Sequence, residues 1–196
     1  MKQVSKLSGI LAVAIGAMFV STAIADDDNT AAARLTGYQE TPLTLNSPGS
    51  GTFKLRISKD EMSIDFQLTY QNLPAVQTPP QVNQAHIHFG RPALNGGVVL
   101  FLCTNLAPPA GVPTPQPCPD APATVTGTLT AADVIAVPGQ SITAGPVGFA
   151  DIIKAIRAKA TYANVHTPGH PGGEIRGRIT DNDNDNDHDG DHNDNK

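Results

Sequence analysis

Short segments in which apolar and polar residues alternate recur along most of the chain. Between Ile64 and Tyr70 every second residue is apolar, and the residues between them are Asp65, Gln67 and Thr69, which is the pattern of a strand with one buried face. Similar alternation, or a short apolar run, occurs at residues 33–38, 51–57, 64–70, 85–89, 98–103, 124–129, 161–166 and 175–179. Gly, Pro, Asn and Asp separate these segments and mark turns. The pattern therefore predicts about eight short β-strands.

One segment has the period of a helix instead. Phe149, Ile152, Ile153 and Ile156 are spaced i, i+3, i+4 and i+7, so that they form one apolar face of an amphipathic helix. We expect a single short helix over residues 149–158. About eight strands with turn residues between them and one helix predict an all-β fold, either a β-sandwich or a flattened Greek-key barrel.

The first 25 residues have the character of an export signal. Lys2 and Lys6 precede an apolar run from residue 7 to residue 20, and Ala23-Ile24-Ala25 follows it; this order is typical of a secretory signal peptide. The alternative is a membrane anchor, but the run is shorter than the roughly 20 residues of a membrane span. We therefore expect cleavage after Ala25, no membrane span in the mature chain, and a secreted or periplasmic protein.

Composition supports one folded domain followed by a polar tail. Hydrophobic residues make up 39% of the chain, which is enough for a core, and the formal net charge is −5, which excludes a generally basic nucleic-acid binder. Residues 181–196 contain seven Asp residues and no apolar residue. We predict a polar leader over 26–31, one domain over 32–180 and a disordered Asp/Asn/His-rich tail over 181–196.

The two cysteines of the chain, Cys103 and Cys118, enclose a Pro-rich segment. In an exported chain an even number of cysteines favours a disulfide, which would stabilise the fold by about 3 kcal/mol in the loop-entropy model. The alternative is a two-cysteine metal site, but the close C-x-x-C spacing of such sites is missing. We predict a structural disulfide.

Three histidines lie on predicted strands. His86 and His88 occupy alternate positions of one strand and so point to the same side, opposite to the apolar residues beside them. The same argument places His166 on the outward side of the 161–166 strand. If these two strands are neighbours in the sheet, the three imidazoles converge.

Three neutral imidazoles are ligands that suit copper or zinc. His170, in the Gly/Pro turn after His166, is a candidate fourth ligand, and Asn164 or backbone carbonyls are candidate acceptors for the ring N–H groups. Protonation competes with a metal, so we expect affinity to fall below a pH of about 6.5. The alternative is that these histidines are ordinary surface polar residues.

Arg176 is a candidate anion-binding residue near the histidines. It lies on the outward side of the last predicted strand, and a guanidinium suits an oxyanion. The alternatives are that Arg176 is solvated or that it forms an ion pair with Glu174.

Several motifs resemble one known family. They are residues 35–42 (LTGYQETP), 85–88 (AHIH), 96–99 (GGVV), 162–167 (YANVHT) and 171–177 (PGGEIRG). Over about residues 32–180 the chain resembles the chordin-type (CHRD) domain, which occurs in chordin and in many exported bacterial proteins. The resemblance implies an immunoglobulin-like β-barrel with limited similarity to copper–zinc superoxide dismutases, and it implies no settled biochemical activity.

The resemblance favours a non-enzymatic exported protein that binds an extracytoplasmic ligand or protein. The alternative is a copper-dependent superoxide-dismutase-like oxidoreductase, because the dismutases have an H-x-H strand and a later strand histidine that match His86, His88 and His166. The bridging histidine and the zinc loop of the dismutases have no counterpart between Gly90 and Cys118, so we expect no dinuclear centre. Nucleophile-elbow, zinc-protease and nucleotide-binding motifs are absent from the sequence.

The tail contains a weak calcium motif. Its acidic positions are Asp185, Asp187, Asp189 and Asp191, which resemble the start of a D-x-D-x-D-G loop. Lys196 stands where such a loop has its bidentate Glu. Loose association of calcium or of a transition metal is one interpretation, and a solvating tail is the other.

Overall fold

The computed structural model describes residues 29–74, 80–107 and 110–181. The predicted signal peptide (1–25), the tail beyond residue 181 and the calcium candidates Asp185, Asp187, Asp189 and Asp191 lie outside the described residues. The strand β1 begins at Thr30, so the last two residues of the expected polar leader already belong to the sheet.

The described chain is all-β with one α-helix, as the hydrophobic pattern predicts. Its strands are β1 (Thr30–Thr36), β2 (Ser50–Ile57), β3 (Ser63–Gln71), β4 (Gln84–Phe89), β5 (Gly97–Thr104), β6 (Ala123–Thr130), β7 (Thr161–His166), β8 (Ile175–Arg178) and β9 (Thr180–Asp181). The helices are η1 (Gly37–Gln39), η2 (Ala131–Asp133), η3 (Pro138–Gln140) and α1 (Gly145–Arg157).

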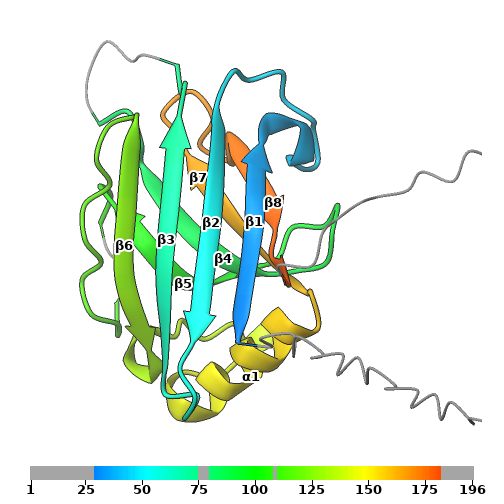
Figure 1. Ribbon diagram of the computed structural model, residues 1–196, viewed down its shortest axis with the longest axis vertical. Helices are drawn as coiled ribbons and strands as arrows, with labels where there is room; N and C mark the ends of the chain where they lie inside the picture. Colours follow the sequence, from blue (N-terminus) through cyan, green and yellow to red (C-terminus); the bar gives the residue numbers. More distant parts are fainter. Residues whose placement is uncertain (1–28, 75–79, 108–109, 182–196) are drawn as a thin grey trace, which may run out of the picture.

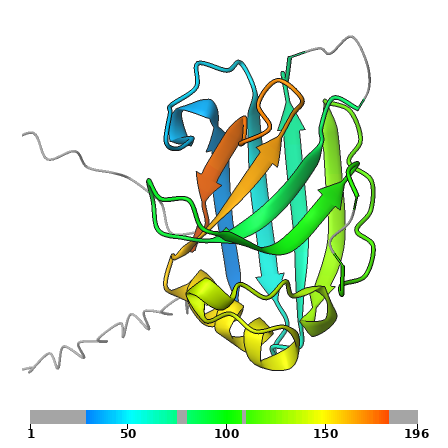
Figure 2. The ribbon, with the colours of Figure 1, turned by 180° about the vertical axis from the view of Figure 1, so that it is seen from behind.

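The strands form one antiparallel sheet that folds over on itself. Its order is β5-β4-β7-β8-β1-β2-β3-β6, and β9 pairs with β1. Strands β1, β2, β3 and β6 form one layer, and β5, β4, β7 and β8 cross behind it (Figures 1 and 2). The predicted flattened barrel is therefore confirmed, and neighbouring strands in it are often distant in the sequence.

The two edge strands, β5 and β6, are joined by the segment that follows β5. Thr104 N donates to Gln116 O (2.9 Å), and the Gln116 amide donates to Leu102 O (3.4 Å) and Thr126 O (2.9 Å). The predicted disulfide between Cys103 and Cys118 is present and ties this segment to β5. The barrel is nearly closed because this segment covers the gap between the two edges.

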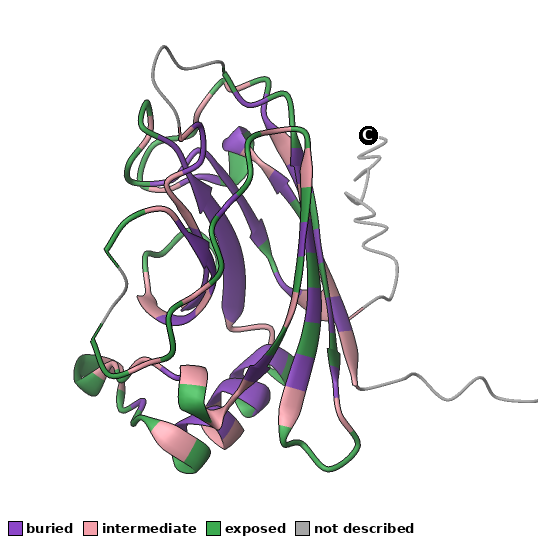
Figure 3. Ribbon diagram, turned by 90° about the vertical axis from the view of Figure 1, so that its left-hand side faces the viewer, coloured by how far each residue is buried: buried purple, intermediate pink, exposed green. Residues whose placement is uncertain are grey.

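Alternate residues of the strands fill the space between the layers. Ile64, Leu68 and Tyr70 of β3 are at most 1% exposed, and Figure 3 shows bands of buried and exposed residues alternating along strands of the sheet. Helix α1 closes one end of the barrel with its buried apolar face (Figure 1). It begins at Gly145, four residues before the expected start. Pro146 suits the first turn of a helix, but this turn does not belong to the apolar i, i+3, i+4, i+7 pattern from which the helix was predicted.

No helix within residues 29–74, 80–107 and 110–181 has the length and apolar character needed to span a membrane.

Candidate metal centre

Strands β4 and β7 are adjacent and antiparallel, which brings the three strand histidines to one face. Ala85 pairs with Val165 and Ile87 pairs with Ala163, and all four are completely buried in the core. Because alternate residues of a strand point to opposite faces, His86, His88 and His166 point away from the core, on the outer face of the sheet. The three histidines therefore point to the side of the sheet that the sequence predicts.

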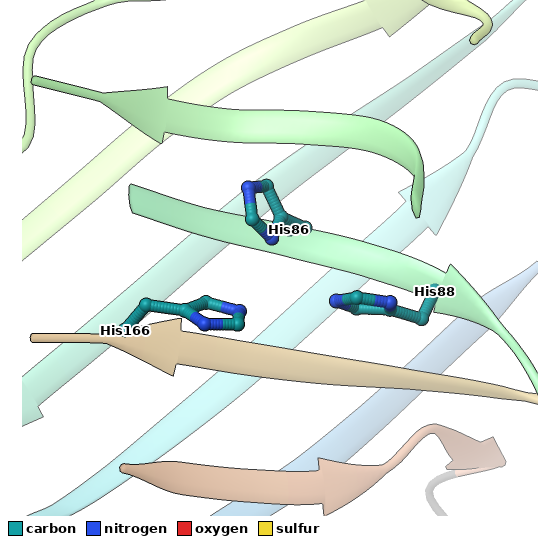
Figure 4. Close-up of side chains that lie close together, drawn as sticks. All are labelled: His86, His88 and His166. Carbon is teal, nitrogen blue, oxygen red and sulfur yellow. The ribbon is translucent and has the colours of Figure 1, made fainter. Parts of the chain in front are cut away.

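The three imidazoles surround a common space (Figure 4). One ligand nitrogen from each of His86, His88 and His166 lies within 4.8 Å of the other two. In a tetrahedral zinc site with bonds of about 2.0–2.1 Å the nitrogens are about 3.4 Å apart, so shifts of about 1 Å would bring these nitrogens to ligation. His170 is not a member of the group; its backbone instead closes a turn with Thr167.

The histidines face outward from the barrel, yet they are buried. The exposed fractions of His86, His88 and His166 are 1%, 8% and 6%. The His86 ring packs edge-on against Phe101, with centroids 4.3 Å apart, and the His88 ring stacks on Tyr162 at 4.6 Å with an interplanar angle of 5°. The interpretation of these histidines as ordinary surface residues is therefore wrong.

Register shifts in the β4–β5 pair help to place Phe101 over His86. The pairing slips between Ala85 and His86 and again between Ile87 and His88. Each slip changes which β5 side chains face outward. As a result Phe101 pairs directly with His86, within the apolar run of β5 that showed no alternation in the sequence.

Backbone carbonyls orient two of the rings. His88 Nδ1 lies 3.0 Å from Gly96 O, and His166 Nδ1 lies 3.0 Å from Pro171 O. A carbonyl oxygen only accepts, so in each ring Nδ1 carries the hydrogen and Nε2 keeps its lone pair. This is the arrangement that commonly fixes a metal-ligating histidine. It uses the backbone carbonyls expected from the sequence, and not Asn164.

Unpaired polar atoms are concentrated at these rings. Among the described residues, the buried side-chain nitrogen and oxygen atoms without a hydrogen-bond partner are His86 Nδ1 and Nε2, His88 Nε2, His166 Nε2, Asn164 Oδ1, Glu40 Oε1 and Thr161 Oγ1. Each such atom costs about 1–3 kcal/mol, so folded proteins keep few of them without a reason. Four of the seven belong to the three imidazoles, and a single metal ion, which takes one nitrogen from each ring, would satisfy three of these four.

Burial keeps the imidazoles neutral. It lowers the pKa of His86 to about 2, with smaller contributions from His166 and His88. It lowers the pKa of His88 to about 4, although the Gly96 carbonyl acts in the opposite direction, and it also lowers the pKa of His166. His86 and His88 are therefore uncharged at neutral and mildly acidic pH, and the pKa of His166 moves in the same direction. The expected loss of metal affinity accordingly moves below pH 6.5.

Arg176 is buried beside the centre and already makes several contacts. Its guanidinium carbon lies 3.4 Å from the centroid of the Tyr162 ring. Its terminal nitrogens donate to Thr41 Oγ1, Asn95 Oδ1 (3.2 Å) and Leu94 O (2.7 Å). An anion at Arg176 would therefore compete with these bonds.

Glu174 does not pair with Arg176. Its carboxylate accepts hydrogen bonds from Ser47 and Thr167, each at 2.6 Å. The ion pair that the sequence offered as an alternative is replaced by two hydroxyl contacts.

Glu40 is a site residue that the sequence reasoning missed. It is 5% exposed, and burial raises its pKa to about 7 although Arg176 partly opposes this rise. A Cβ placed on Gly173 would lie 2.6 Å from Asn164 Nδ2 and 2.8 Å from both Asn164 Oδ1 and Glu40 Oε1, so a larger residue at this position would force these two side chains to move. The signal available in the sequence was the position of Glu40 inside the LTGYQETP motif.

The comparisons with known proteins give one match. The family model of the CHRD domain matches residues 31–179, while no curated protein and no solved structure matches the chain. The matched range contains β1 except for Thr30, all of β2 to β8, α1 and the three clustered histidines. The chain belongs to the CHRD domain family.

Proposed function

We propose that this chain is an exported CHRD-domain protein with a binding role, and that its binding site is a mononuclear copper or zinc centre formed by His86, His88 and His166. Membership in the CHRD domain family and the Cys103–Cys118 disulfide support a binding role outside the cytoplasm. The observation that carries the metal site is the set of four buried imidazole nitrogens without hydrogen-bond partners.

The donor set fits such an ion. Neutral imidazole nitrogen is a preferred ligand of zinc and copper, and the depressed pKa values leave the lone pairs of these rings free. The Gly96 and Pro171 carbonyls hold His88 and His166 with Nε2 as the available donor. When bound, the ion supplies a positive centre with room for a further ligand, since three-histidine sites leave a coordination position open.

Metal titration tests the proposal. The full mature chain is stripped with a chelator, exchanged into metal-free buffer and titrated with Zn²⁺ or Cu²⁺ by calorimetry. We expect one tight equivalent, which is lost when His86→Ala and His166→Ala are combined and kept in the matched control His170→Ala. Metal content of the natively exported protein, measured by mass spectrometry, identifies the ion.

The double variant also separates the centre from the polar tail, because it leaves every residue of the tail in place. Binding that is as tight and as stoichiometric in the double variant as in the wild type contradicts the proposal. Loss of the equivalent in His170→Ala contradicts the assigned ligand set.

A copper-dependent oxidoreductase is the second candidate. The specific observation that favours it is the three-nitrogen donor set, because an open position at copper would admit a small oxygen species. The test is superoxide consumption by the copper-loaded chain compared with His88→Ala. A binding function predicts equal, low rates for the two proteins; fast consumption that His88→Ala abolishes supports the oxidoreductase instead.

A further inference from the structure

A cleft with a volume of about 460 Å³ lies beside the histidine cluster. Its walls are residues 38–42 and 44 in and after η1, Gly90 and residues 92–93 after β4, and residues 161–162 of β7 with Arg176 and Arg178 of β8. This volume lies within the usual range for small-molecule sites. Tyr162, whose ring stacks on His88, forms part of the wall, so the cleft and the histidine cluster are neighbours but separate spaces.

Arg176 holds the walls of the cleft in place. Its guanidinium donates to Thr41 in one wall and to Leu94 and Asn95, which directly follow the lining residues 92–93 of the other wall. Thr41 Oγ1 itself donates to Asn95 Oδ1 at 2.5 Å. Two loops that are far apart in the sequence are thereby joined. A cleft whose walls are fixed in advance loses little freedom when it binds a ligand.

Arg178 presents an unused guanidinium fork to the cleft. Only its Nε is bonded, donating to Lys159 O at 3.1 Å; among the described residues its terminal nitrogens form no hydrogen bond or ion pair, and the residue is exposed. Such a fork matches the two oxygens of a carboxylate. The one acid that lines the cleft, Glu40, has a pKa raised to about 7 by burial, so the cleft is cationic at neutral pH.

The rest of the lining suits a hydroxylated ring. Tyr38 is 66% exposed, and its hydroxyl donates to Asn46 Oδ1 at 3.0 Å, which holds the aromatic ring at the rim. Gln39 and Thr44 add an amide and a hydroxyl to the lining. An exposed aromatic face next to neutral hydrogen-bonding groups packs against the apolar face of a sugar ring and pairs with its hydroxyls.

We propose that this cleft is a binding site for a small sugar acid, whose carboxylate pairs with Arg178 and whose ring packs on Tyr38. The proposal goes beyond the metal centre and does not depend on it, because no residue of the histidine cluster lines the cleft.

The experiment uses the full mature chain, metal-free and zinc-loaded in parallel, and measures binding by calorimetry. The probes are D-galacturonate, D-galactose, which lacks the carboxylate, and inorganic phosphate, which lacks the ring. We expect saturable binding of galacturonate in both metal states and binding of galactose that is weaker by tenfold or more, because charge-assisted hydrogen bonds to the fork are lost.

Three variants locate the site. Arg178→Gln is expected to weaken galacturonate binding by about tenfold or more, while Arg56→Gln, the same change at an exposed position of β2 outside the cleft, leaves it unchanged. Tyr38→Ala is expected to weaken galacturonate but not phosphate. Circular dichroism of each variant checks that the barrel is intact.

Three results would overturn the proposal. They are equal binding of galactose and galacturonate, equal binding by Arg178→Gln and the wild type, and phosphate binding as tight as galacturonate, which would make the cleft a simple anion site. Each of them leaves the metal titration untouched, so failure here is distinguishable from failure of the histidine centre.

Discussion

Replacing His86 with leucine should stabilise the metal-free protein. His86 is 1% exposed, its ring packs against Phe101, and neither of its nitrogens has a hydrogen-bond partner. A polar side chain in such a place is unfavourable unless something ligates it. If His86 is retained for a metal, its apolar replacement should raise stability while it abolishes binding.

The size of the effect follows from the two unpaired nitrogens. At the lower limit of about 1 kcal/mol for each, removing them gains about 2 kcal/mol, and repacking a side chain of similar volume costs up to about 1 kcal/mol. We therefore expect His86→Leu to raise the free energy of unfolding by about 1 kcal/mol. For a domain of this size that is a rise of about 2–4 °C in Tm.

The pH dependence gives an independent sign. The folded-state pKa of His86 is lowered to about 2 from its ordinary 6.5. Below pH 6.5, His86 therefore becomes protonated in the unfolded chain but stays neutral in the folded chain. Wild-type stability therefore falls on acidification, by up to about 1.4 kcal/mol per pH unit for this group. The leucine variant lacks this group, so its advantage should widen as the pH falls from about 7.5 to about 5.5.

Urea unfolding followed by circular dichroism, with chelator present, measures both effects. His170→Leu is the matched control, because His170 lies outside the cluster, and its free energy of unfolding should change little. Added zinc should stabilise the wild type and not His86→Leu. The reasoning is refuted if metal-free His86→Leu is less stable than the wild type at both pH values, or if the difference does not grow on acidification.

Three further outcomes are expected. Zinc affinity, measured by calorimetry, should fall only at a pH below 6.5, because burial lowers the pKa of all three imidazoles; a fall centred near pH 6.5 would contradict the burial argument. Converting Cys103 and Cys118 to serine should cost about 3 kcal/mol in urea unfolding, because the bond spans 15 residues; an unchanged midpoint would contradict this. Glu40→Gln should stabilise the protein more at about pH 8 than at about pH 5. The pKa of the wild-type carboxyl is raised from 4.5 to about 7, so the wild-type protein loses stability as the pH rises through this range; equal gains at the two pH values would show that Glu40 ionises normally.

Local pattern was sufficient for the elements of this protein and for the direction of its side chains. Alternation along β3 and β7 identified strands and their buried faces, since the two-residue period of a strand is a property of the segment itself. The same period placed His86, His88 and His166 on the outer face. The apolar spacing predicted α1 except for its first turn. The two cysteines predicted the disulfide between them.

Only the tertiary structure decided what surrounds these side chains. The strand β7, which carries His166, pairs with β4 although it lies more than 70 residues later in the chain. No local pattern specifies which distant strand will be a neighbour. Phe101 and Tyr162 bury the outer-face histidines, which the alternation of residues along a strand would by itself place in solvent. That burial lowers the pKa of the imidazoles and raises that of Glu40, because desolvation depends on everything packed around a group, whereas a sequence period reports only the direction in which the group points.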